Sequence, residues 1–382
     1  KDITEEEYKE FYTHISHDWN PPLKHLHIKL EGTTEYTALL YVPSKAPIDL
    51  FQPEFKHGVH LYCRRVFIMD NCKELLPEYL SFVRGVVDAP DLNLNISREI
   101  LQQDRLVRNI RKNLVRKLLE LLQGLPSEDY HSFYDEFGAV LKVGIHTDPD
   151  NRSRLADLLR YHTTSSTDKW VSLKTYVEEM KPDQKEIYFA TGDDLSALVN
   201  SPRLERLKEK GYDVLMMTDP VDEWVVQSLT EYDGKPLKSA EKGDLELDPE
   251  ETPSEDAFKD LFGFIKAELQ DRIKEVKAST RLKDSPACLS GDAFDPSAYM
   301  EKILKATGQT PPSVKRVLEL NTRHPALETI RDLHATRRND QRLKDYAHLL
   351  YDLAVVGEGG KIDNPSRFSK LVGDLLKGAV AS

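Results

Sequence analysis

Hydrophobic and polar positions follow two different periods along the chain. Residues 25–42 alternate around Glu31-Gly32-Thr33-Thr34, which predicts two antiparallel strands joined by a turn. Residues 59–69 have the composition of a further strand. Over residues 97–124 the apolar side chains recur every three or four positions, which predicts a long amphipathic helix. The start, Ile3-Thr4-Glu5-Glu6-Glu7, predicts a capped helix, because Glu7 follows Thr4 by three positions.

The next segment has the pattern of a βαβ unit. Strands are predicted over residues 186–191 and 213–218, with a helix over residues 195–210 between them. Strands connected in this way run parallel in one sheet. Helical spacing over residues 127–142 and 152–162 precedes this unit and predicts a helical connector.

A strongly acidic stretch interrupts these patterns. Residues 242–256 (KGDLELDPEETPSED) contain seven acidic residues, two prolines and almost nothing to bury, which predicts a linker. Beyond it the spacing predicts helices and two short strands. The helices are expected at 256–277, 296–307, 325–335, 340–356 and 365–380, and the strands at 286–289 and 314–320.

The predicted fold class is therefore α/β and α+β, in more than one domain. The first domain contains two α/β subdomains joined by helices, and a smaller α+β domain follows the acidic linker. The expected bounds are 1–240 for the first domain, with subdomains 1–125 and 169–240 and a connector at 126–168, then 241–256 for the linker and 257–382 for the last domain.

Composition limits the class of protein. The chain has 382 residues, a net charge of −12 and 39% hydrophobic residues, which is too apolar for a disordered chain. The acidic balance argues against a dedicated nucleic-acid binder. Neither a membrane-spanning stretch nor a secretory signal is found in the sequence, and Lys1 is not a translation start, so a fragment is expected. Cys63, Cys72 and Cys288 form no C-x-x-C motif, and we expect a reducing, cytoplasmic compartment.

Basic residues gather on the long predicted helix. The segment from Ser97 to Lys117 contains seven Arg and Lys residues and two acidic residues, which gives a local charge of +5. Such a face is typical of a solvated helix surface, and it is also suited to phosphate. Arg98 and Gln102 lie four positions apart at the helix start, where free N–H groups favour an anion, so one guanidinium and one amide could meet a terminal phosphate there.

Three motifs favour structural interpretations. Residues 357–361 (GEGGK) resemble a phosphate loop but lack its first Gly and its Ser/Thr, which indicates a turn between helices. Gly192-Asp193-Asp194 lacks the glycines of a dinucleotide loop and is interpreted as a helix cap. His25 and His27 have no third ligand at metal spacing, so no metal site is expected. The hydrolase motifs G-x-S-x-G and H-E-x-x-H do not occur in the sequence.

Apolar side chains are placed where they could form either a partner surface or ordinary core. Trp224 follows two acids, Asp222 and Glu223, on a predicted short helix. Met300, Ile303 and Leu304 form an apolar edge of the helix at 296–307. The last two predicted helices carry apolar stripes that suit either dimerisation or packing on their own domain. The stripe residues assigned to dimerisation are Leu349, Leu353, Phe368, Leu371 and Leu375.

The chain also resembles a known family. Residues 74–113 (ELLPEYLSFVRGVVDAPDLNLNISREILQQDRLVRNIRKN) closely resemble the middle domain of the heat-shock protein 90 chaperone family, bacterial HtpG type. The motifs S-R-E-[IL]-L-Q-Q and R-G-V-V-D are highly specific, and the resemblance spans essentially all 382 residues. Further similar segments are EEEYKEFY (5–12), ALLYVPSKAPIDLF (38–51), RRVFIMDN (64–71), DEWVVQSLTEYDGK (222–235) and LELNTRHP (318–325).

The resemblance implies the middle and C-terminal domains of an ATP-driven, homodimeric chaperone. The nucleotide pocket of the family belongs to an N-terminal domain that has no match here, so ATP and Mg²⁺ are expected only in the full-length parent and no cofactor is expected on this chain. In the family, the Arg of S-R-E and the first Gln of Q-Q reach the γ-phosphate. These residues correspond to Arg98 and Gln102, with Asn95 as a supporting group, and their role would be transition-state charge stabilisation.

The resemblance also implies partners. They are a second copy of the chain, unfolded or partly folded client proteins, and the N-terminal ATPase domain, with no nucleic acid and no membrane. Co-chaperones that dock on an acidic M-E-E-V-D tail are not expected, because the chain ends GAVAS. Two alternatives stay open: a self-contained nucleotide-binding α/β enzyme that uses residues 186–218, and an oligomeric scaffold without an ATPase role. The implied client contacts are Trp19, Glu223, Trp224, Met300, Ile303 and Leu304.

Overall fold

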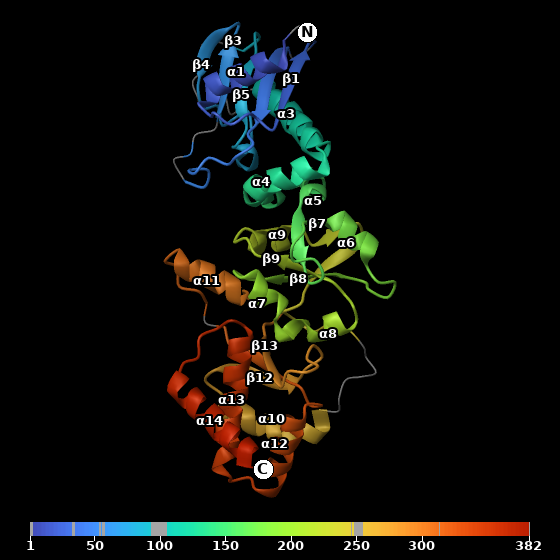
Figure 1. Ribbon diagram of the computed structural model, residues 1–382, viewed down its shortest axis with the longest axis vertical. Helices are drawn as coiled ribbons and strands as arrows, with labels where there is room; N and C mark the ends of the chain where they lie inside the picture. Colours follow the sequence, from blue (N-terminus) through green and yellow to red (C-terminus); the bar gives the residue numbers. More distant parts are fainter. Residues whose placement is uncertain are drawn as a thin grey trace. The chain divides into compact units, whose positions relative to one another are not determined.

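The structure is a computed structural model with three sheets and many helices (Figure 1). The chain forms two compact units, here named unit 1 and unit 2. Unit 1 contains residues 1–160, 172–174 and 224–232, and unit 2 contains residues 161–171, 175–223 and 233–382. The predicted α/β and α+β fold class is confirmed, whereas the domain bounds at 240 and 256 stay predictions. The residues described are 3–32, 35–52, 55, 58–92, 105–245, 247, 255–312 and 314–381.

Unit 1 contains a five-stranded sheet in the order β1-β2-β5-β3-β4. The predicted hairpin is confirmed, because β1 pairs antiparallel with β2 and Leu26 lies opposite Leu40. One face of the sheet is buried, which explains the alternation in the sequence. The strands are β1 (Lys24–Leu30), β2 (Tyr36–Val42), β3 (Gly58–Cys63), β4 (Val66–Met69) and β5 (Arg84–Asp88).

The single strand predicted over residues 59–69 is wrong, because the segment is a hairpin. Arg64 and Arg65 both have positive φ, 51° and 66°, and reverse the chain between β3 and β4. Such angles are unfavourable for side chains other than Gly. The Nε of Arg64 donates to the carbonyl oxygen of Pro90 (3.1 Å), and the backbone N–H of Arg65 donates to the Asp88 carboxylate (3.2 Å). These tertiary hydrogen bonds stabilise a turn that has no local sequence signal.

Helices complete unit 1. The predicted capping box on α1 is confirmed: Thr4 N–H donates to Glu7 Oε2 (2.7 Å), and Glu7 N–H donates to Thr4 Oγ1 (3.3 Å). The long basic helix is confirmed from Arg105 onwards, whereas residues 93–104 lie outside the described part. The helices are α1 (Glu5–Ser16), α3 (Arg105–Gln123), α4 (Ser127–Thr147) and α5 (Arg152–Leu158), with 3-10 turns η1 (Glu78–Leu80) and η2 (Pro149–Asn151).

The second sheet has the order β10-β11-β8-β9-β6-β7. The βαβ prediction is confirmed, because β8 and β9 run parallel, with Tyr188 opposite Val214. The helix predicted over 195–210 is interrupted by Pro202, which begins a 3-10 turn. The helix predicted over 152–162 ends at Leu158, because the next residues form β6 and pair with β9. The strands are β6 (Arg160–Thr163), β7 (Val171–Ser172), β8 (Ile187–Thr191), β9 (Val214–Met217), β10 (Glu231–Tyr232) and β11 (Lys235–Ser239).

Short helices connect the strands of this second sheet. Those that replace the predicted helix 195–210 are α7, η3 and α8, and α9 carries Trp224. Their bounds are α6 (Leu173–Glu179), α7 (Leu195–Val199), η3 (Pro202–Leu204), α8 (Glu205–Glu209) and α9 (Asp222–Ser228).

The third sheet has the order β12-β14-β13 and belongs to unit 2. The helix predicted over 256–277 is wrong beyond Glu268, because Ile273–Ala278 forms β12, parallel to β14. Ile273 and Val276 are three positions apart, a spacing that also fits a helix, and pairing with β14 selects the strand. The strands are β12 (Ile273–Ala278), β13 (Ala287–Ser290) and β14 (Arg316–Leu320).

Helices bury one face of this third sheet (Figure 1). Leu343, Ala347, Leu350 and Ala354 lie at helical spacing on α13 and are all buried in one core with β12, β13 and β14. None of the helices in the described part of the chain is long and apolar enough to span a membrane. The helices are η5 (Glu255–Phe258), α10 (Lys259–Glu268), α11 (Ala298–Ala306), α12 (Pro325–Thr336), α13 (Gln341–Gly357) and α14 (Pro365–Ala381).

Candidate functional site

The residues proposed to meet a γ-phosphate precede α3. Asn95, Arg98 and Gln102 fall within residues 93–104, outside the described part of the chain. Their role therefore stays a prediction. What the structure describes is the helix that follows them, which begins at Arg105.

The first half of α3 presents four cations. Arg105, Arg108 and Lys112 are exposed, and Arg111 is half-buried. Among the described residues, none of the four forms an ion pair. Three or four like charges on one helix surface produce a positive potential that attracts anions.

In the second half of α3, both cations pair with a carboxylate of the same helix. Glu120 accepts from Arg116 (2.8 Å) and from Lys117 (2.9 Å). The Lys117 ammonium group, followed by the Arg116 guanidinium, holds the pKa of Glu120 below its usual value. Arg116 also donates to Asn113 Oδ1 (2.7 Å). The positive surface of α3 is therefore concentrated at the end that follows residues 93–104.

Trp19 is the most exposed of the residues proposed to bind clients. Its side chain is 89% exposed and lies in the loop between α1 and β1. The loop is held by Asp18, which accepts from the Tyr12 hydroxyl (2.8 Å) and from the Asn20 backbone N–H (2.9 Å). A large aromatic side chain on a fixed loop is an available contact for an apolar partner.

Glu223 and Trp224 have opposite environments although they are neighbours on α9. Glu223 is 3% exposed, whereas Trp224 is 36% exposed. The carboxylate of Glu223 accepts from the Ser297 hydroxyl, which in turn accepts from Met300 N–H (2.8 Å) at the start of α11. Glu223 therefore supports the N-terminal end of α11. Trp224 is the residue of the two whose side chain is exposed and available for contact.

The helix α11 is anchored along one side. The Tyr299 hydroxyl donates to the carbonyl oxygen of Thr218 (3.0 Å), and Lys302 pairs with Asp193 (3.0 Å). Burial raises the pKa of Tyr299 to about 12. Met300, Ile303 and Leu304 are half-buried, so part of each side chain faces outward.

Phe294, four residues before α11, is an exposed aromatic residue that the helical and strand spacings did not select. Its side chain is fully exposed. It stands alone among polar residues in the sequence SGDAFDPS, residues 290–297, and this isolation is the signal that could have identified it.

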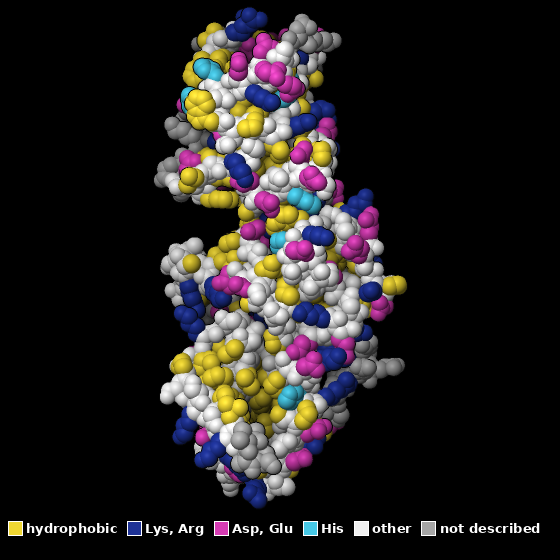
Figure 2. All heavy atoms as spheres, viewed as in Figure 1, with side chains coloured by type: hydrophobic (Ala, Val, Ile, Leu, Met, Phe, Trp, Pro, Cys, Tyr) yellow, Lys and Arg dark blue, Asp and Glu magenta, His cyan; other side chains and the backbone are white. Residues whose placement is uncertain are grey.

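Apolar side chains also gather on α13 and α14, as Figure 2 shows when it is compared with Figure 1. Leu353 and Leu375 are exposed, and Phe368 and Leu371 are half-buried. Leu349 differs from the other proposed dimerisation residues, because it is packed inside the protomer with 7% exposure. Val356 and Leu376, which were not assigned to dimerisation, are exposed as well.

Two glycine motifs have the structural roles that the sequence favoured. Asp194 caps α7, because its carboxylate accepts from Ala197 N–H (2.7 Å). Gly357 ends α13, and the turn continues through Gly359 at φ 72°. The carboxylate of Glu358 in this turn pairs with Arg203 (3.2 Å). These loops therefore begin or end helices, and one of them carries a carboxylate that forms an ion pair.

The two histidines on β1 pack against α1. His25 stacks on the Tyr8 ring (4.0 Å between centroids), and His27 Nδ1 shares a hydrogen bond with the Tyr8 hydroxyl (2.9 Å). Burial lowers the pKa of His27. Across the described residues, no group of three or more His, Cys, Asp or Glu side chains is arranged to hold a metal ion.

Comparison with known families covers the whole chain. Residues 1–382 match the Hsp90 protein family. The chain belongs to this family. The resemblance recognised in residues 74–113 is thereby confirmed.

The relatives are bacterial chaperones. The chain is 50% identical over 388 residues to "Chaperone protein HtpG" of Geobacter metallireducens and of Geobacter sulfurreducens, and 46% identical over 385 residues to that of Mycolicibacterium paratuberculosis. Each match covers 98% of this chain and 60% of the relative. The chain therefore spans about 60% of the length of the curated relatives it matches.

A solved structure is similar in fold. It is the middle domain of a Plasmodium falciparum protein named as a heat shock protein, with a TM-score of 0.58 and 33% identity. The similarity covers 63% of this chain and 97% of that domain.

Proposed function

We propose that this chain is the middle and C-terminal part of an ATP-dependent molecular chaperone. In this proposal it binds unfolded or partly folded client proteins, assists ATP hydrolysis by an N-terminal domain, and dimerises. The observation that carries the proposal is the match of all 382 residues to the Hsp90 family, together with 50% identity to proteins named HtpG chaperones. A cytoplasmic location accords with relatives of this kind.

The assisting role falls to the segment before α3. Arg98 and Gln102 would contact the γ-phosphate of ATP held by the N-terminal domain, with Asn95 as support. Bound ATP with Mg²⁺ would supply the hydrolysis reaction. The cations Arg105, Arg108 and Lys112 fit this role, because their charges have no carboxylate partner among the described residues and favour a polyphosphate nearby.

Client binding is supported by exposed apolar side chains. Trp19 and Trp224 offer aromatic surface, and Met300, Ile303 and Leu304 offer part of an apolar helix edge. Methionine and aromatic groups adapt to many partners, which suits weak contacts with partly unfolded chains. Glu223 enters the proposal as the residue that supports the start of α11.

Dimerisation is supported by the surface of the two last helices. Leu353 on α13 and Leu375 on α14 are exposed in the protomer. Phe368 and Leu371, also on α14, are half-buried. Covering about four such side chains contributes on the order of 1 kcal/mol or more each. A second copy of the same helices is the partner that we propose, through an isologous interface.

The alternatives make different predictions for ATP hydrolysis. A self-contained enzyme would need a phosphate loop at the end of β8, but Asp193 and Asp194 there are engaged by Lys302 and by the start of α7. A scaffold would leave Arg98 and Gln102 without a catalytic role. ATPase measurements therefore distinguish all three functions.

The decisive experiment measures ATP hydrolysis by this chain alone, by the N-terminal domain of an HtpG relative alone, and by their mixture. We expect no activity from this chain alone and stimulation in the mixture. Arg98→Ala should reduce the stimulated rate about tenfold or more, with nearly unchanged ATP affinity. Lys117→Ala is the matched control, because its charge is already paired with Glu120, and it should change the rate less than about twofold.

The other outcomes are equally informative. Hydrolysis by this chain alone would support the enzyme alternative. A mixture that behaves as the sum of its parts would support the scaffold. An equal loss of affinity and rate in Arg98→Ala would make Arg98 a binding residue.

A further inference from the structure

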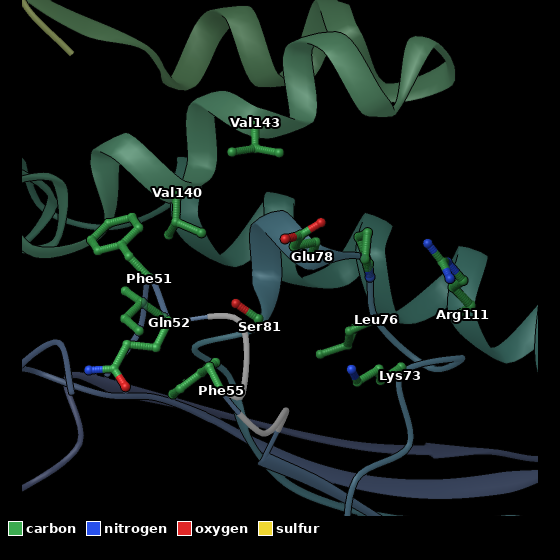
Figure 3. Close-up of a pocket in the computed structure, with 12 residues that line it drawn as sticks. Phe51, Gln52, Phe55, Lys73, Leu76, Glu78, Ser81, Arg111, Val140 and Val143 are labelled. Carbon is green, nitrogen blue, oxygen red and sulfur yellow. The ribbon is translucent and has the colours of Figure 1, made fainter. Parts of the chain in front are cut away.

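Unit 1 contains a cavity that none of the proposed roles uses. Its volume is about 640 Å³, within the range of roughly 300–1,000 Å³ that is common for small-molecule sites. Its walls are the loop after β2, the segment around η1, and one face each of α3 and α4 (Figure 3). The residues that the argument uses are Phe51, Phe55, Lys73, Glu78, Arg111 and Val143.

The loop that forms one wall makes stabilising contacts near both ends of its described part. At its start, Glu136 on α4 accepts from the Lys45 ammonium group (2.7 Å) and from Ala46 N–H (2.9 Å). At its end, the Arg84 guanidinium lies 5.0 Å from the centre of the Phe55 ring. Between these points, the backbone N–H groups of Leu50, Gln52 and Phe55 donate to the carbonyl oxygens of Pro47, Asp49 and Gln52, respectively. The cavity therefore lies beside a braced loop.

The facing wall is one side of α4. Glu136, Val140 and Val143 follow each other at spacings of four and three, so they share a face of the helix. Glu136 holds the loop, whereas the two valines line the cavity. The same helix face thus both fixes the distance to the loop and provides an apolar surface.

The two ends of the cavity differ in character. In Figure 3, Phe51, Phe55 and Val140 lie on one side, and Lys73 and Arg111 lie on the other. Burial of an apolar group at the first end is favourable in proportion to its area. The second end offers an ammonium and a guanidinium group, which are donors suited to a carboxylate.

Charge balance favours an anion of single charge. Within the described residues, Lys73 and Arg111 form no ion pair, and Glu78 is the one carboxylate among those that line the cavity. Asp148 is not among the lining residues; it accepts from the Tyr79 hydroxyl (2.7 Å) and from the Asn151 side chain (2.9 Å). Counted over the described lining residues, Lys73 and Arg111 against Glu78 leave one positive charge in excess.

We propose that this cavity binds a small amphipathic carboxylate of the class of medium-chain fatty acids. The carboxylate is placed at Lys73 and Arg111, and the hydrocarbon chain lies between Phe51, Phe55 and the valines of α4. This site is separate from the chaperone function proposed above, and its test does not involve ATP or clients.

The test is calorimetric titration of the chain with octanoate, decanoate and octan-1-ol, each below the concentration at which it aggregates. We expect saturable binding of one octanoate per chain and about tenfold tighter binding of decanoate, from two further buried methylene groups. Octan-1-ol should bind about tenfold more weakly than octanoate, because it lacks the charge. Equal affinities for the acid and the alcohol would overturn the proposal.

Variants locate the site. Arg111→Met should weaken octanoate binding about tenfold, whereas Lys112→Met, which removes an exposed charge from the next position of α3 and outside the lining, should leave it unchanged. Val143→Trp should abolish binding by filling the cavity. Val143→Met, a smaller change, should weaken binding if Val143→Trp does not fold, as judged by circular dichroism. Unchanged binding in the Arg111 variant and in a folded Val143 variant would show that the acid binds elsewhere and would refute the site.

Discussion

A buried ionic network in unit 2 permits a quantitative prediction. Arg203 lies between Glu241 (2.7 Å) and Glu358 (3.2 Å), and all three side chains are largely buried. Glu241 also accepts from the Thr191 backbone N–H (3.0 Å). Burial alone would lower the pKa of Arg203, but the charges of Glu241 and Glu358 raise it above its usual value. The network connects β8 to the turn that ends α13.

The perturbation is Arg203→Met, which keeps the aliphatic volume and removes the charge. Glu241 retains its hydrogen bonds from Thr191, so Glu358 is the carboxylate that loses most. Removing one partner of a buried ion pair destabilises a protein by roughly 3–5 kcal/mol. Because Glu241 stays partly satisfied, we expect the lower end, about 3 kcal/mol, and a fall in Tm of about 10 °C.

The loss should depend on pH. Burial raises the pKa of Glu358, although Arg203 partly opposes this. A carboxyl whose pKa is raised in the folded state contributes stability below its unfolded pKa, and this contribution is lost as the pH rises through the folded pKa. Without Arg203 the folded pKa of Glu358 rises further. The difference between variant and parent should therefore shrink as the pH falls from 7 towards 5.

The assay is urea unfolding followed by the fluorescence of Trp170, which stacks on His162 (4.2 Å) within unit 2. Trp19 and Trp224 are replaced by Phe in every protein compared. Arg338→Met is the matched control, because its pair with Asp260 is exposed on both sides and should contribute less than about 1 kcal/mol. A loss in Arg203→Met as small as in this control, or one independent of pH, would refute the energetic role of the network.

Three further predictions concern the proposed dimer interface, the proposed client-binding surface and one backbone position. Leu371→Asp with Leu375→Asp should convert dimers to monomers in sedimentation velocity, because charges would be placed in the proposed apolar interface. Trp224→Arg with Met300→Asp should weaken binding of an unfolded model client while changing Tm little, because neither side chain is fully buried. Gly85→Ala should lower the free energy of unfolding by about 3 kcal/mol or more, since a Cβ at φ +151° would lie 2.2 Å from a carbonyl oxygen of β2.

Each of these three has a control or an outcome that would contradict it. Ser369→Asp adds a charge at an exposed polar position of α14 and should leave dimers intact; a parent chain that is monomeric at micromolar concentration would contradict the interface. A large fall in Tm for the Trp224 and Met300 variant would identify these residues as core. Gly234→Ala, with positive φ but open space around the new methyl group, should cost about 1 kcal/mol. If Gly85→Ala lowered the free energy of unfolding by only as much as Gly234→Ala, the steric argument would be contradicted.

Local patterns in the sequence determined much of the secondary structure. The capping box at Thr4 and Glu7, the hairpin of β1 and β2, and the parallel β8 and β9 each follow from residues close in sequence. Local hydrogen bonds, side-chain alternation and short connections are enough to specify such elements. Family membership could also be recognised from the sequence, because the motifs in residues 74–113 are specific.

Tertiary contacts decided the segments that local spacing predicted wrongly. Ile273 and Val276 fit helical spacing, but pairing with β14 buries them in a strand. Arg64 and Arg65 form a turn because Asp88 and Pro90 bind them there. These partners are distant in sequence, so no window of neighbouring residues contains the deciding interaction.

The same distinction applies to the candidate sites. The residue pattern identified Trp224 and the apolar residues of α11 as possible contacts, and the family resemblance added Trp19. Neither could separate buried Glu223 from its exposed neighbour. The sequence also could not place Leu349 inside the protomer. The cavity beside Phe51 exists because Glu136, 85 positions later, holds the loop that begins near Lys45. Residue type and spacing determine which chemistry is present, whereas burial and cavity shape depend on neighbours that only the folded chain brings together.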